Sequence, residues 1–178
     1  MTELKSLLVF RLILLNACVL AFFAWAYAKG LVQWLFGMES TGIGYALVAL
    51  AVFAIGAGFH RAIKVTRAFD SIKAGKWVDV SKFRAKSFYV GRIAFYLMLM
   101  GLEGNILGFL LAFSEVDFNG GPDTILASIN AMSGGFKIAF ANSFIGTGLA
   151  AWVYLNSDIL GTATTLLRID ADRLRGKL

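Results

Sequence analysis

Four apolar stretches, each close to the length of a membrane-spanning helix, constrain this chain more than any other feature. They cover about residues 7–28, 43–60, 91–113 and 136–156. Crossing the hydrocarbon core of a bilayer takes roughly 20 mostly apolar residues in a helix. Of the 178 residues, 58% are hydrophobic and 16% are charged, against about 45–50% and about 25% in soluble domains. We therefore expect an all-α, polytopic membrane protein, with residues 1–178 in a single membrane domain and four transmembrane helices.

The scarcity of some residue types excludes several kinds of chemistry. One cysteine cannot form an intramolecular disulfide framework, and one histidine leaves no cluster of histidines to hold a metal ion. The sequence contains no nucleophile beside a base and no phosphate-binding loop. We therefore expect a protein that is not an enzyme and that needs no metal and no cofactor.

Charge is distributed unevenly between the loops. The net charge is +6, and the basic residues gather in the loop 61–90 and in the tail 159–178. The loop 29–42 has one basic residue, and the loop 114–135 has none but has three acidic ones. Because loops rich in lysine and arginine stay in the cytoplasm, we expect both termini and the loop 61–90 to be cytoplasmic. Binding to anionic lipid headgroups also explains this loop, and both explanations can hold; a nucleic acid partner is not expected.

The basic loop has its own helical pattern. Apolar residues recur at helical spacing after residue 60, so the second span is expected to continue as a helix that stops near Gly75. A second helix is expected to lead into the third span, and a cytoplasmic helix is expected at 159–178.

The last two spans each carry a stripe of small, weakly polar residues. At about 100° per residue, the stripes consist of Gly101, Gly104, Asn105 and Gly108 in the third span and of Ala139, Ser143, Gly146, Thr147 and Ala150 in the fourth. Two interpretations remain open. Small residues are commonly used for close packing of membrane helices, and they would equally form the smooth, sparingly wet wall of a pore.

The order of these residues resembles a known family. The segment 101–113, GLEGNILGFLLAF, resembles the G-L-L-G-T-V-x-G-x-x-x-x-F segment of the MotA/TolQ/ExbB proton-channel family. The segment 135–146, GFKIAFANSFIG, resembles the G-x-x-x-A-(L/M)-x-x-T-x-x-G segment in the last span of that family. The resemblance is confined to these two spans.

The resemblance implies a channel or stator subunit in the bacterial cytoplasmic (inner) membrane. It implies a homopentamer whose central pore holds two copies of a single-span partner, each with a membrane carboxylate. Protons, or sodium ions, would pass along this pore and drive mechanical work. The threonines that act as polar stations in the family fall on Asn105 and Ser143. The implied pore lining is Gly101, Gly104, Asn105, Gly108, Ser143, Gly146 and Thr147.

One acidic residue, Glu103, departs from the family pattern, which has a leucine at this position. On a helical wheel it lies about 160–200° from the Gly/Asn stripe. Intramembrane carboxylates are commonly functional, so Glu103 is either a second proton site or a tie between helices, with Arg11, Asn16 or Lys137 as a partner. The alternative function is therefore a self-sufficient small proton-coupled transporter or channel that uses Glu103.

Overall fold

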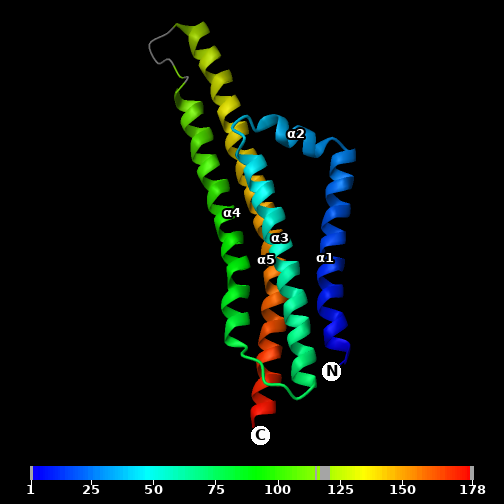
Figure 1. Cartoon of the computed structure of the whole chain (residues 1–178). Helices are drawn as coiled ribbons and strands as arrows, with labels where there is room; N and C mark the ends of the chain where they lie inside the picture. Colours follow the sequence, from blue (N-terminus) through cyan, green and yellow to red (C-terminus); the bar gives the residue numbers. More distant parts are fainter. Residues whose placement is uncertain (1, 115, 117–120, 177–178) are drawn as a thin grey trace. The chain divides into compact units, whose positions relative to one another are not determined.

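The computed structural model describes residues 2–114, 116 and 121–176, and this part of the chain is all-helical. Helices account for 90% of the residues. The five helices follow in the order α1 (Thr2–Ala28), α2 (Leu31–Met38), α3 (Ile43–Lys73), α4 (Ser81–Ser114) and α5 (Pro122–Arg175) (Figure 1).

Four of these helices, α1, α3, α4 and α5, are long and apolar enough to cross a membrane. The expected all-α fold, with four helices able to span a membrane, is thereby confirmed. The helices also run past the expected spans, because α4 has 34 residues and α5 has 54. At about 1.5 Å per residue, the roughly 30 Å of a hydrocarbon core takes about 20 residues, far fewer than the 54 of α5.

Most of the expected loop 61–90 is helical. The second span continues as α3 to Lys73, and α4 begins at Ser81. Gly75 has a φ of 71°, a left-handed conformation that glycine adopts without a steric penalty. The N–H of Gly75 donates to the carbonyl of Ile72 at 3.0 Å, and the N–H of Lys76 donates to that of Ser71 at 2.9 Å. This pair of bonds is a Schellman motif, so α3 stops where the glycine predicts.

The helix expected at 159–178 is present in the described residues as the end of a longer helix. The last span and the residues after it form one helix, α5, which continues to Arg175. The sequence has its only proline at position 122, where α5 begins, so no later residue lacks the N–H needed for the helical hydrogen bonds. The glycines inside α5 are not sufficient to end it.

The long helices are divided between two compact units. Unit 1 comprises Met1–Phe22, Ala51–Ala94 and Ala151–Leu178, and unit 2 comprises Phe23–Leu50 and Phe95–Ala150. Aliphatic side chains and alanines form the core of unit 1, among them Leu12, Val65, Val90, Val153, Leu160 and Leu167. In unit 2 the buried apolar residues are Ala26, Leu47, Leu97, Ala112, Ala139, Ala141, Ile145, Leu149 and Ala150.

A buried polar network joins α1 to α5 inside unit 1. The Asn16 amide donates to the Asn156 side-chain oxygen at 2.7 Å, and the Trp152 indole N–H donates to the Asn16 oxygen at 2.8 Å. Asn16 also donates to the carbonyl of Leu12 at 2.7 Å. Buried polar groups are costly unless they are hydrogen-bonded, so this network fixes the register of α1 on α5.

Replacing Asn16 with alanine is expected to destabilise the protein by about 1–3 kcal/mol, because it removes the bonds between helices at roughly 0.6–1.7 kcal/mol each. Cys18→Ala is the matched control, since Cys18 is on the same helix and exposed. The measurement is the unfolding midpoint of the purified protein in detergent. Equal midpoints for the two variants would contradict the role given to Asn16.

Candidate functional site

In unit 2, α4 and α5 lie side by side and their backbones nearly touch (Figure 1). A methyl group placed on Gly108 would lie 2.4 Å from the backbone nitrogen of Ala139. A methyl group on Gly135 would lie 2.5 Å from Cα of Ala112. These distances are far below ordinary van der Waals contact. Only glycine therefore fits at these two positions.

The same close approach continues at the other end of the contact. A methyl group on Gly101 would lie 2.9 Å from Cα of Gly146, and one on Gly146 would lie 2.6 Å from Cα of Gly101. Gly104 faces the side chain of Asn142, whose Cβ would be 2.7 Å from the added carbon. We call this contact between α4 and α5 the glycine seam. Within one chain, the small-residue stripes are therefore used for close packing of two helices.

Four residues of the predicted pore lining lie in the glycine seam. Gly101, Gly104, Gly108 and Gly146 are buried, and each meets the neighbouring helix of its own chain. In the single chain these four positions hold the helix pair together and present no open surface. Their part in a lining stays a prediction for the assembled protein.

The predicted polar stations differ in their surroundings. Ser143 is half-buried and Thr147 is exposed; the Thr147 hydroxyl donates to the carbonyl of Ser143 at 2.7 Å. Asn105 is half-buried, and its side-chain oxygen is buried without a hydrogen-bond partner among the described residues. Ser143 and Thr147 therefore leave polar groups on the open side of α5, next to the exposed Phe144.

Glu103 lies on the side of α4 away from the glycine seam, as the helical wheel predicts, and its side chain is exposed. Within the described residues, its carboxylate has no hydrogen bond or ion pair. Of the three expected partners, Asn16 is bonded instead to Asn156 and Trp152, and Arg11 and Lys137 are exposed. A tie between helices of one chain is thus not formed by the described residues.

A second acidic residue, Glu39, lies between α2 and α3 and was not predicted from the sequence. It is 5% exposed. One carboxylate oxygen, Oε1, accepts from the backbone N–H of Thr41 at 2.8 Å and from the Thr41 hydroxyl. The other oxygen, Oε2, is buried and has no hydrogen-bond partner among the described residues. Glu39 is the only acidic residue in the stretch 29–42. This was the only feature of the sequence that pointed to Glu39.

Asn142 connects Glu39 to the glycine seam. It is fully buried, and its amide donates weakly to the Thr41 hydroxyl at 3.5 Å and to the carbonyl of Gly104 at 3.4 Å. Its side-chain oxygen is buried without a partner in the described part of the chain. Two unpartnered acceptors, on Glu39 and Asn142, therefore belong to one polar cluster.

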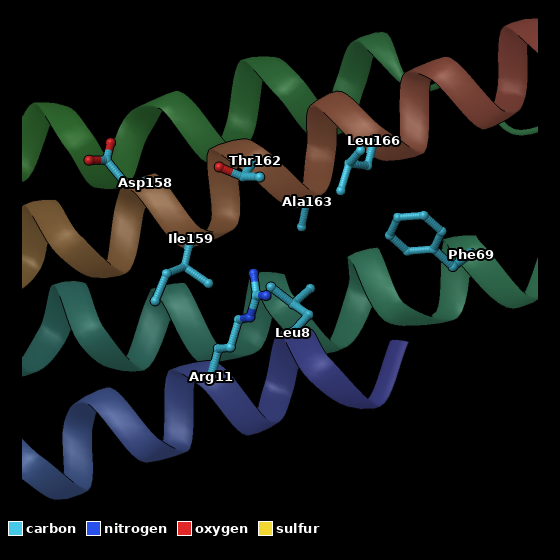
Figure 2. A pocket seen from close by; sticks show the side chains of 8 residues that line it. All are labelled: Leu8, Arg11, Phe69, Asp158, Ile159, Thr162, Ala163 and Leu166. Atoms are coloured by element: carbon cyan, nitrogen blue, oxygen red, sulfur yellow. The ribbon is translucent and has the colours of Figure 1, made fainter. Parts of the chain in front are cut away.

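A separate cavity of about 190 Å³ lies in unit 1 between α1, α3 and α5. It is lined by Leu8, Arg11, Phe69, Asp158, Ile159, Thr162, Ala163 and Leu166, and Figure 2 shows the Arg11 side chain extending from α1 toward α5. Arg11 and Asp158 form no ion pair in the described ranges. Throughout residues 2–114, 116 and 121–176 there is also no group of three His, Cys, Asp or Glu that would hold a metal ion. The cavity therefore has a mostly apolar wall that carries one cationic side chain, Arg11, and one carboxylate, Asp158.

Comparison of the chain with protein-family models, with curated proteins and with solved structures gives no match. The resemblance of segments 101–113 and 135–146 to the MotA/TolQ/ExbB family therefore depends on those motifs alone.

Proposed function

We propose that this chain is a proton-conducting channel or stator subunit of the bacterial inner membrane. In this proposal it converts ion-motive force into mechanical work through a single-span partner held in the central pore of a homopentamer. The support is the motif resemblance of the last two spans together with one structural observation, the open polar face of α5.

The open face is the observation that carries the proposal. The glycine seam holds one side of α5 against α4. Thr147 and Gly148 are exposed on the remaining side, with Ser143 at its edge. A methyl group on Gly148 would meet no atom within 4 Å, so this part of the helix is free to approach a second chain closely. We therefore assign the lining to this face, with Ser143 and Thr147 as its polar stations.

The chemistry of such a lining follows from solvation. A carboxyl group that moves between water and hydrocarbon loses its hydrogen bonds to water, and an unpaired polar group in an apolar medium is costly. Hydroxyl groups such as that of Thr147 replace part of this hydration. Gly148 leaves room for a partner helix beside Thr147, while the exposed rings of Phe140 and Phe144 lie on the same side of α5 and would contact that partner.

Proton flux into liposomes tests the proposal. The purified chain is reconstituted alone and together with a single-span chain that co-purifies with it, and the internal pH is followed with a dye. We expect flux only when the partner is present, since the proposal places the titrating carboxylate on the partner. Flux of equal size from the chain alone would overturn the need for a partner.

The alternative, a self-sufficient proton-coupled transporter or channel, is favoured by the exposed carboxylate of Glu103. It predicts that the chain alone conducts protons and that Glu103→Gln reduces this flux at least tenfold. Asp123→Asn is the matched control, because Asp123 is also an exposed acid of unit 2. If neither variant changes the flux, Glu103 is not the coupling carboxylate.

A further inference from the structure

We infer that Glu39, Thr41 and Asn142 form a proton-binding site in unit 2, with the carboxyl group of Glu39 as the group that holds the proton. This inference does not depend on the proposed function, because the three residues belong to one chain and no partner is needed to form the cluster.

The cluster contains hydrogen-bond acceptors that have no donor in the part of the chain that the structure describes. Oε1 of Glu39 has two donors, the N–H and the hydroxyl of Thr41. Oε2 of Glu39 and the side-chain oxygen of Asn142 have none among the described residues. Both side chains are more than nine-tenths buried. The cluster thus has two buried acceptors without a donor within the described chain, and a proton on the carboxyl group of Glu39 removes the buried negative charge that Oε2 would otherwise share.

The surroundings of Oε2 limit which cation can bind to Glu39. A methyl group placed on Gly44 would lie 3.2 Å from Oε2 of Glu39, 3.2 Å from the terminal carbon of Ile145 and 3.3 Å from the ring of Phe36. Oε2 therefore faces backbone and hydrocarbon. Hard metal cations require several oxygen ligands around them, which this apolar side of the carboxyl does not provide. A proton needs no such shell.

The other charged residues that the structure describes in unit 2 lie elsewhere on its surface. The groups that the structure places around Glu39 are uncharged: Phe36 from α2, Thr41 just before α3, Gly44 in the first turn of α3, and Asn142 and Ile145 from α5. The carbonyl of Gly104 on α4 reaches the same amide of Asn142. The other described charged residues of unit 2 are Lys29, Glu103, Asp123 and Lys137, all exposed. Within the described chain no cation pairs with Glu39.

Infrared difference spectroscopy of the purified full chain tests this site. The spectrum of Glu39→Gln is subtracted from that of the wild type near neutral pH. We expect the difference to contain the C=O stretch of a protonated carboxylic acid and to lack the two bands of a carboxylate. A carboxylate signature in the difference would overturn the inference.

Three further results test the proton-binding site. Glutamine keeps an acceptor for both donors of Thr41 and mimics the neutral acid, so Glu39→Gln is expected to fold; a variant that does not fold contradicts the inference. The control variant Asp123→Asn is expected to leave the protonated-acid band unchanged. Finally, replacing KCl with NaCl should not change the band, and its loss in sodium would identify a sodium site instead.

Discussion

Alanine at Gly108 is expected to lower the stability of the purified protein by about 1–3 kcal/mol, the usual cost of overpacking. The cost should lie at the upper end of this range, since the added methyl meets the backbone of Ala139 at 2.4 Å and backbone atoms of a packed helix cannot turn away. The α4–α5 pair must separate to accept it. The measurement is the unfolding midpoint in detergent.

Gly134→Ala is the matched control for this experiment. Gly134 also lies within a helix of unit 2, but a methyl group there meets nothing within 4 Å. Alanine in a helix interior is favoured over glycine by roughly 0.5–1 kcal/mol, so this variant is expected to be neutral or slightly more stable. If both variants behaved alike, the glycine seam would not hold the helices together.

Valine at Thr147 is expected to abolish proton-driven output of the assembled protein while leaving its copy number unchanged. Valine has the shape of threonine without the hydroxyl, so the change removes only the polar group on the open face of α5. The Thr147 hydroxyl donates to the Ser143 carbonyl of its own helix, so its loss breaks no contact between helices. The measurement is proton flux in liposomes that contain the chain and its partner.

Thr165→Val provides the comparison for Thr147. Thr165 is also exposed on α5, and its hydroxyl donates to the carbonyl of Gly161 at 3.0 Å. It lies in the segment 159–178, which we expect to be outside the membrane, so its valine variant should conduct as the wild type does. Normal flux in Thr147→Val, or equal loss in both variants, would remove Thr147 from the proposed proton path.

The sequence was sufficient to predict the parts of the fold that depend on local pattern. Apolar length predicted the four long helices, and Gly75 predicted the end of α3, because both depend on residues close together in the chain. The spacing of Gly101, Gly104 and Gly108 defined one helix face, but it did not say what covers that face. Its cover is α5, through residues such as Ala139 and Gly146.

Glu39 illustrates what the sequence could not reveal. It lies between two helices, where a loop acid is usually solvated. Its burial arises from groups distant in the chain, since Asn142 and Ile145 meet the cluster from about a hundred residues away. Glu103 shows the opposite case: its place on the side of α4 away from the glycine seam follows from the helical wheel, and its side chain is exposed in the single chain.

Electron cryomicroscopy of the assembly purified from the membrane tests the central claim most directly. The account predicts five copies of this chain around a central cavity, with Ser143 and Thr147 of each α5 facing the axis and the glycine seam closed within each copy. A single chain or a dimer, with the Thr147 face of α5 against lipid, would contradict it.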